Sequence, residues 1–122
     1  MSAPANGDPG TAVPVARLAE VEPGVPLAVT LPDGAAVCLV RDGATVLAVE
    51  DRCPHRDFPL SNGEVVAPGV LECPWHGARF DARTGRCLAG PATDGLATWT
   101  VTVADGMVCL GARHAAPDEA GT

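Results

Sequence analysis

The stretch AAVCLVRDGATVLAVE, residues 35–50, consists of two runs of β-forming residues on either side of Asp42-Gly43. β-Branched residues favour extended strands, and Asp-Gly readily takes the positive φ angles of tight hairpin turns. The stretch TWTVTVADGMVCLGA, residues 98–112, repeats this pattern around Asp105-Gly106. Its apolar residues alternate with threonines, which is typical of a strand with one buried and one solvated face. Both stretches therefore predict antiparallel hairpins.

The rest of the chain agrees with a β structure. A further strand is predicted within VPLAVTLPDG, residues 25–34, and short strands are predicted at 70–72, 78–81 and 86–88. No stretch of ten or more residues has the apolar period of a helix, and no internal repeat is present. The sequence predicts an all-β domain, a small antiparallel sandwich or barrel.

Composition narrows the class of protein. A length of 122 residues suits one domain, and because aromatic residues make up only 3% and tyrosine is absent, the core must be aliphatic. The formal net charge is −7, which disfavours nucleic acid or an anionic membrane as a partner. A protein partner with a basic docking face fits better.

Both ends of the chain have the composition of unstructured segments. Residues 1–13 and 112–122 are rich in small residues and proline and are predicted to be disordered tails, which leaves a domain at 14–111. The N-terminus lacks the basic and apolar regions of a signal peptide, and the longest apolar run, Ala35 to Val40, is far shorter than the ~20 residues of a membrane helix. These features predict a cytoplasmic protein without a membrane partner.

Two predicted loops carry the residues with metal-binding chemistry. Cys53 and His55 form a C-x-H pair, and after seventeen residues Cys73 and His76 form a C-x-x-H pair. A reducing cytosol disfavours disulfides, so metal binding is the better interpretation of these cysteines. Zinc accepts two Cys and two His, but its usual spacing pairs Cys with Cys and His with His. A two-iron cluster accounts for the mixed pairs, since two His replace two Cys on one iron in the Rieske arrangement.

The stretch from Cys53 to Thr93 resembles the Rieske [2Fe–2S] family, specifically the small ferredoxins that serve ring-hydroxylating dioxygenases. The segments CPHRDFPLSNGEV and ECPWHGARFDARTGRCLAGPA, with the β segments around them, match in order. The resemblance covers roughly residues 13–111, with a cluster-binding part at about 51–93. It implies one [2Fe–2S] cluster per chain, whose inner iron is bound by Cys53 and Cys73 and whose outer iron, near the surface, is bound by His55 and His76.

Several neighbouring residues gain expected roles from this resemblance. Pro54 stiffens the first loop, and Gly77 allows close approach of the backbone to the cluster. Trp75 is expected to shield the cluster from water, and Pro91 to lie in a third loop that covers it. The cysteines outside the motif are expected to be buried thiols: Cys38, Cys87 and Cys109.

The chain departs from the Rieske proteins of membrane complexes at informative positions. Those proteins brace the two loops with a disulfide, whereas the matching positions here are Phe58 and Trp75. They also donate hydroxyl hydrogen bonds to the cluster from a Ser and a Tyr, and here these positions are Ala78 and Phe80. The resemblance therefore implies neither a respiratory nor a photosynthetic role.

The remaining residues favour an electron carrier over an enzyme. An oxygenase needs a second iron bound by two His and a carboxylate. Once the cluster has taken two of the three histidines, only His114 remains. No G-x-G-x-x-G element for a dinucleotide is present either. The resemblance implies transfer of electrons from a flavin-dependent reductase to a terminal oxygenase. Two alternatives stay open: the small subunit of an assimilatory nitrite reductase, and a non-redox module whose loops hold zinc or nothing.

Overall fold

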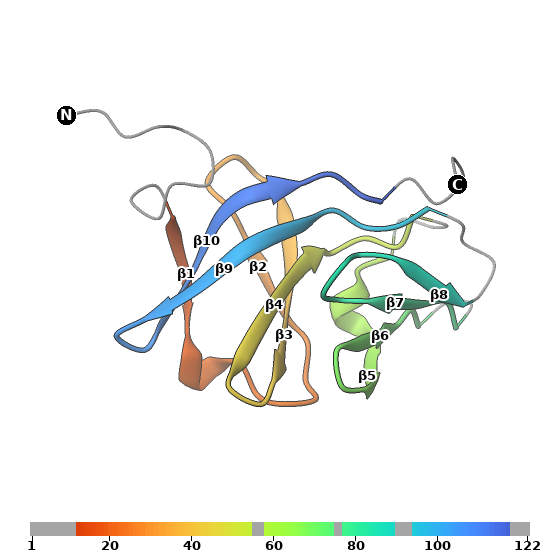
Figure 1. Ribbon diagram of the computed structural model, residues 1–122, viewed down its shortest axis with the longest axis horizontal. Helices are drawn as coiled ribbons and strands as arrows, with labels where there is room; N and C mark the ends of the chain where they lie inside the picture. The colour runs from red at the N-terminus through yellow and green to blue at the C-terminus, as the bar shows by residue number, and fades with distance from the viewer. Residues whose placement is uncertain (1–11, 55–57, 75–76, 90–93, 118–122) are drawn as a thin grey trace.

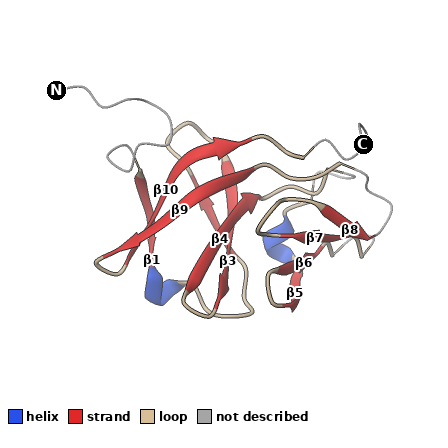
Figure 2. Cartoon of the chain, in the orientation of Figure 1, coloured by secondary structure: helices blue, strands red, loops and turns tan. Residues whose placement is uncertain are grey.

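The computed structural model describes residues 12–54, 58–74, 77–89 and 94–117, which are almost entirely β structure (Figure 2). They contain two 3-10 turns, η2 (Leu18–Glu20) and η3 (Leu60–Asn62), and no α-helix. The strands are β1 (Val13–Arg17), β2 (Leu27–Thr30), β3 (Ala36–Asp42), β4 (Thr45–Glu50), β5 (Glu64–Ala67), β6 (Val70–Glu72), β7 (Arg79–Asp81), β8 (Cys87–Ala89), β9 (Thr98–Ala104) and β10 (Met107–His114). The predicted all-β class is confirmed.

The strands form two antiparallel sheets that lie beside one another (Figure 1). The larger sheet has the order β1-β10-β9-β4-β3-β2, and its edge strands β1 and β2 contact each other, so the sheet is nearly closed. The smaller sheet is the meander β5-β6-β7-β8. It is inserted between β4 and β9, and it contains the second of the two Cys-His segments. The larger sheet therefore serves as a platform for the smaller one.

Strand β3 separates two hydrophobic cores. Four consecutive residues, Val37, Cys38, Leu39 and Val40, are fully buried. Since neighbouring side chains of a strand point to opposite faces, Val37 and Leu39 pack into the core of the larger sheet, and Cys38 and Val40 pack toward the smaller sheet. The continuous apolar run of β3 thus reflects burial on both faces.

The β9–β10 hairpin has the turn that its sequence predicts. Ala104 pairs with Met107, so Asp105 and Gly106 are the two central residues of the turn. Their φ angles are 52° and 75°, both in the left-handed region that a type I′ turn requires. The Asp-Gly prediction is confirmed here.

The β3–β4 hairpin differs from its prediction by one residue. Asp42 pairs with Thr45, so the central residues are Gly43 and Ala44 instead of Asp42 and Gly43. Only Gly43 has a positive φ, 63°. A two-residue turn with glycine at its first central position suits the right-handed twist of the flanking strands equally well. The side chain of Asp42 is thereby left in the strand, where it forms an ion pair.

The ordered domain extends beyond the boundaries that the sequence predicts. Strand β1 begins at Val13, and β10 continues to His114, which the sequence analysis placed in a tail. Thr100 Oγ1 and His114 Nε2 lie 2.7 Å apart, and His114 pairs with Thr98 in the β9–β10 ladder. Pairing of the backbone therefore orders a segment whose composition alone resembles a linker. Within the described ranges, no helix is long and apolar enough to cross a membrane.

Replacement of Gly85, the glycine that ends the β7–β8 turn, by alanine should cause a measurable loss of stability. Gly85 has a φ of +82°, and a Cβ at this position would overlap the carbonyl oxygen of Leu96. Gly34 has a φ of +92° but open space around its Cα. Both Gly→Ala variants should lose about 1–2 kcal/mol from the left-handed backbone, and Gly85→Ala should lose about 3 kcal/mol in total because Leu96 must also move. Denaturant unfolding followed by circular dichroism measures the difference, and equal losses would contradict it.

Candidate metal centre

The first Cys-His segment begins just after β4. The Cys53 N–H donates to the carbonyl oxygen of Phe58 at 2.9 Å, which brings these two residues together. The side chain of Cys53 is 2% exposed, so it points into the protein interior. His55 lies within 55–57, outside the described residues. The structure thus places the predicted cysteine ligand in the core.

The second segment repeats this geometry between β6 and β7. The Cys73 N–H donates to the carbonyl oxygen of Ala78 at 2.7 Å, again five residues later, and Cys73 is 1% exposed. Gly77 donates its N–H to the Cys73 carbonyl at 3.2 Å and has a φ of +72°, in the region that favours glycine. Trp75 and His76 lie outside the described residues. The two loops are therefore matched in their closing hydrogen bonds as well as in sequence.

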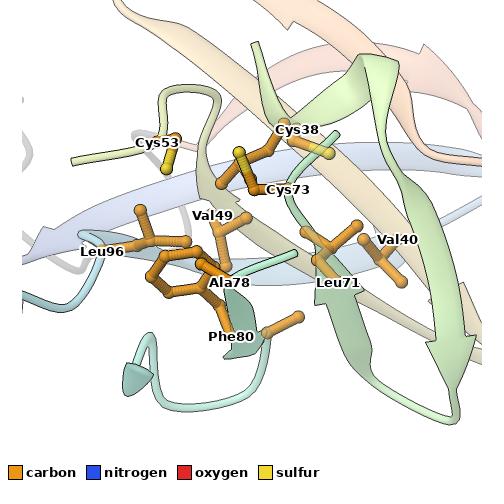
Figure 3. Packing of buried hydrophobic residues seen from close by; sticks show 11 residues of the cluster. Cys38, Val40, Val49, Cys53, Leu71, Cys73, Ala78, Phe80 and Leu96 are labelled. Carbon is orange, nitrogen blue, oxygen red and sulfur yellow. The ribbon is translucent and has the colours of Figure 1, made fainter. Parts of the chain in front are cut away.

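Both cysteines belong to one hydrophobic cluster between the two sheets. Figure 3 shows Cys53, Cys73 and Cys38 in its upper part, above Phe80. Among the residues that the structure describes, no three His, Cys, Asp or Glu side chains come together as a metal site. Two of the four predicted ligands, the histidines, are not among those residues. The two predicted ligands that the structure describes, Cys53 and Cys73, lie in the same hydrophobic cluster.

Two of the predicted neighbours of the cluster are also buried there. Ala78 and Phe80 are fully buried in the same hydrophobic cluster as Cys53 and Cys73, the two predicted cysteine ligands. Pro54 is partly buried beside Cys53. Pro91 lies within 90–93, outside the described residues. A hydroxyl introduced at position 78 or 80 would therefore be shielded from water.

The three other cysteines differ from one another in burial. Cys38 is fully buried, and burial, followed by the negative charge of Asp51, raises the pKa of its thiol. It therefore remains protonated and is a poor metal ligand. Cys87 and Cys109 are only partly buried, so the expectation of buried thiols is right for Cys38 and wrong for these two. Cys87 lies on β8, an edge strand that has no neighbour on its outer side within the described sheet.

Asp51 and Ser61 brace the first loop, and sequence reasoning missed both. The Asp51 side chain is 8% exposed, and it accepts hydrogen bonds from the Ser61 N–H and the Ser61 hydroxyl, each at 2.7 Å. Ser61 lies in η3, so this pair joins the segment before Cys53 to the turn that follows the loop. One signal was available: an acidic residue directly after a strand that is expected to be buried.

Arg83 connects the two sheets at the β3–β4 turn. Its guanidinium forms an ion pair with Asp42 of β3 and donates to the carbonyl oxygen of Pro68 at 3.5 Å. The Arg83 N–H donates to Asp81 Oδ1 at 2.8 Å, which holds the β7–β8 turn. Both partners of the ion pair are solvent-accessible, so its contribution to stability is small. Its structural effect is to fix the smaller sheet against the β3–β4 hairpin.

The comparison with protein families decides the identity of this centre. The family model described as the Rieske [2Fe-2S] domain matches residues 11–100. The chain belongs to the Rieske [2Fe–2S] family. Its cofactor is therefore a Rieske-type [2Fe–2S] cluster, as the sequence resemblance implied.

Curated relatives of this Rieske chain are ferredoxin subunits. The 3-phenylpropionate/cinnamic acid dioxygenase ferredoxin subunit of Photorhabdus laumondii is 40% identical over 88 residues, covering 66% of this chain and 84% of the relative. The subunit of the same name in Escherichia coli K12 is 34% identical over 106 residues, covering 87% of this chain and 95% of the relative. The similarity thus extends over nearly the whole length of these small proteins.

Solved structures with the same fold include further ferredoxins. The Sphingomonas yanoikuyae B1 ferredoxin superposes with a TM-score of 0.78 at 30% identity, covering 82% of this chain and 97% of that chain. A chain from a complex of reduced oxygenase and oxidised ferredoxin in carbazole 1,9a-dioxygenase gives 0.76 at 31%, covering 82% and 92%. A protein described as the small subunit of an NADPH nitrite reductase gives 0.73 at 30%, covering 84% and 99%.

The described residues fit the inner half of a Rieske cluster. Thiolate ligands suit iron–sulfur clusters, and Cys53 and Cys73 are both buried in one apolar cluster. Their loops follow strands of different sheets, β4 and β6, whose positions are fixed by the packing between the sheets. An apolar, water-excluding environment also protects such a cluster and tunes its potential.

Proposed function

We propose that this Rieske chain is a one-electron carrier that passes electrons from a flavin-dependent reductase to a terminal ring-hydroxylating oxygenase. The observation that carries the proposal is its similarity, over most of its length, to ferredoxin subunits of dioxygenase systems. The bound cluster supplies the chemistry, which is uptake and release of a single electron. The chain itself binds the cluster, excludes water from its inner half and docks on the partner proteins.

We further propose the ligand set that the sequence predicts. Cys53 and Cys73 bind the inner iron, which is supported by their burial and by the matched hydrogen bonds of their loops. His55 and His76 bind the outer iron, which is supported by their place in the two matched sequence segments. The family resemblance implies that the outer iron lies near the surface, so we propose it as the point of exit for the electron.

The inventory of histidines argues against a second, catalytic iron. Beyond the two proposed ligands, the chain has only His114. Its Nε2 is 2.7 Å from Thr100 Oγ1 near the end of the β9–β10 ladder. A site with two His and a carboxylate therefore lacks its residues in this chain. In this proposal the chain transfers electrons, and its partner oxygenase carries out the oxygenation.

A second candidate function is the small subunit of a nitrite reductase. It is favoured by one observation, the similarity to the protein described as such a subunit, which covers 99% of that chain. It is weaker than the ferredoxin proposal, because the curated relatives at 40% and 34% identity are dioxygenase ferredoxin subunits. The two candidates differ in the acceptor that they reduce.

Reconstituted electron transfer tests the proposal. The purified protein should contain two irons and two acid-labile sulfides per chain and should show, when reduced, an EPR signal that averages below the free-electron g value. With a flavin-dependent ferredoxin reductase as donor, it should support substrate turnover by a ring-hydroxylating oxygenase and not nitrite reduction by a siroheme enzyme. Stoichiometric zinc without sulfide would contradict the cluster itself. Nitrite reduction alone would favour the second candidate.

The missing hydroxyls predict a low reduction potential, nearer about −150 mV than +300 mV within the Rieske range. Hydrogen bonds to the cluster favour its reduced form, and a bond to a charged group contributes roughly 1.5–3 kcal/mol. At 59 mV for each tenfold change, each restored donor should raise the midpoint by at most about 60–130 mV. Protein-film voltammetry of Ala78→Ser combined with Phe80→Tyr measures this shift. A wild-type midpoint well above zero, or no rise in the variant, would contradict it.

The net charge predicts that salt slows encounter with a basic partner. The Debye length falls from about 30 Å at 0.01 M to about 8 Å at 0.15 M ionic strength, which screens long-range attraction. The cluster-binding segment 51–93 contains five arginines and five carboxylates, so the excess of negative charge lies in the rest of the chain. We therefore expect a moderate decrease in the rate of electron transfer, measured by stopped flow. A rate independent of salt would exclude electrostatic steering and leave the carrier function intact.

The proposed carrier acts in the cytoplasm. No disulfide joins any of the five cysteines in the structure, whereas stabilising disulfides are typical of exported proteins. The partner proteins of the proposal, a flavin-dependent reductase and an oxygenase, would meet it there.

A further inference from the structure

Asp51 is a buried charge beside the proposed cluster. It is the only charged side chain classed as buried in the described part of the chain. Its two carboxylate oxygens accept hydrogen bonds from the N–H and the hydroxyl of Ser61, both neutral donors. None of the ion pairs among the described residues includes Asp51. Since burial of a carboxylate is unfavourable, its presence here points to a function.

The position of Asp51 brings this charge close to the cluster. Two peptide units separate Asp51 from Cys53, so their Cα atoms lie within about 7 Å of each other. The charge also acts inside the core: after burial, it is the second cause that raises the pKa of the Cys38 thiol. Cys38 belongs to the same hydrophobic cluster as Cys53 and Cys73. The field of Asp51 therefore extends into the apolar region where the two proposed cysteine ligands lie.

We infer that Asp51 lowers the reduction potential of the cluster by holding a fixed negative charge next to its inner half. Reduction adds one electron from the reductase to the cluster, with no bond made or broken, and oxidation passes that electron to the acceptor. The added negative charge is repelled by the carboxylate, so the oxidised form is favoured. At a separation of about 10 Å and an effective dielectric constant of about 20, the repulsion shifts the ratio of the two forms by roughly tenfold.

The inference rests on the proposed ligands and on the carrier function, and its test is separable from theirs. The variant Asp51→Asn removes the charge and keeps the shape and an acceptor oxygen for the Ser61 N–H. Its midpoint should rise by about 59 mV, the one-electron equivalent of a tenfold change. Failure of the ligand proposal appears earlier, as missing iron and sulfide in the wild-type protein. Failure of the inference alone leaves an intact cluster whose midpoint does not rise.

Two further variants separate charge from packing. Asp105→Asn removes an exposed carboxylate at the β9–β10 turn, where the φ of 52° is also acceptable for asparagine, and its midpoint should not change. Ser61→Ala removes the hydroxyl that donates to Asp51 Oδ2. The carboxylate charge is then less compensated, so the midpoint should fall, whereas a purely structural role of the pair predicts that Asp51→Asn and Ser61→Ala shift it in the same direction.

Voltammetry of the three variants, with iron and sulfide analysis and EPR to confirm an unchanged cluster, decides the matter. A rise in Asp51→Asn, a fall in Ser61→Ala and no change in Asp105→Asn support the inference. No rise in Asp51→Asn, a rise in Ser61→Ala, or an equal rise in Asp105→Asn would overturn it. If Asp51→Asn does not assemble a cluster, Ser61→Ala decides alone, and an unchanged or raised midpoint then overturns the inference.

Discussion

Replacement of Cys73 by alanine is expected to abolish cluster binding. Iron and acid-labile sulfide should fall from two per chain to less than about a tenth of that value, because an iron that has lost a thiolate ligand is left open in an apolar interior. Cys53→Ala should behave in the same way. Iron and sulfide analysis after anaerobic purification, together with the visible spectrum, measures the loss.

Cys38→Ala is the matched control for this prediction. Cys38 belongs to the same hydrophobic cluster and is as fully buried as Cys73, but burial and the charge of Asp51 raise its pKa. The variant should keep two irons and two sulfides and should lose only some stability from the smaller side chain. Loss of the cluster in Cys38→Ala, or its retention in Cys73→Ala, would show that the ligand assignment is wrong.

Replacement of Phe80 by alanine should cause one of the largest losses of stability among single core substitutions in the described residues. Among the residues that the structure describes, Phe80 is the largest fully buried side chain, and it packs between the two sheets with Leu71 and Leu96 (Figure 3). Truncation of a buried phenylalanine destabilises by about 3–5 kcal/mol. For a domain of this size, that corresponds to a melting temperature at least about 12 °C lower.

The chain contains a second phenylalanine that serves as a control. Phe58 is 37% exposed, so Phe58→Ala should lower the melting temperature by only a few degrees. Thermal unfolding of the holoproteins, followed in parallel by circular dichroism and by visible absorption, compares the two variants. Similar shifts for both would mean that Phe80 does not hold the smaller sheet against the larger one.

The sequence by itself determined the family and much of the fold. The C-x-H and C-x-x-H segments depend on ligand chemistry at fixed local spacing, and the family comparison confirms the Rieske family that they predict. The β9–β10 hairpin was predicted because Asp105-Gly106 sets the conformation of its own turn. The strand at Val70–Glu72 was predicted to the residue. In each case the decisive interactions are between residues close in sequence.

The tertiary structure decided what depends on distant partners. The double burial of β3 follows from the smaller sheet, which covers the second face of Val37–Val40 only after the chain has folded. The turn at Gly43 is one residue later than predicted because Asp42 pairs with Thr45 in the strands, and it also forms the ion pair with Arg83. The order of residues 112–114 comes from pairing with β9, which composition does not reveal.

Asp51, near the proposed cluster ligands, also shows the difference between what local sequence predicts and what the fold decides. Its sequence neighbours identify it only as an acidic residue after a strand. Its burial and its two hydrogen bonds from Ser61, ten residues later, exist only in the folded chain. Local sequence therefore predicts which side chains hold the iron, because coordination requires particular ligand atoms. The fold decides which charges are buried near the proposed ligands, and the strength of an electrostatic interaction depends on distance and burial in three dimensions.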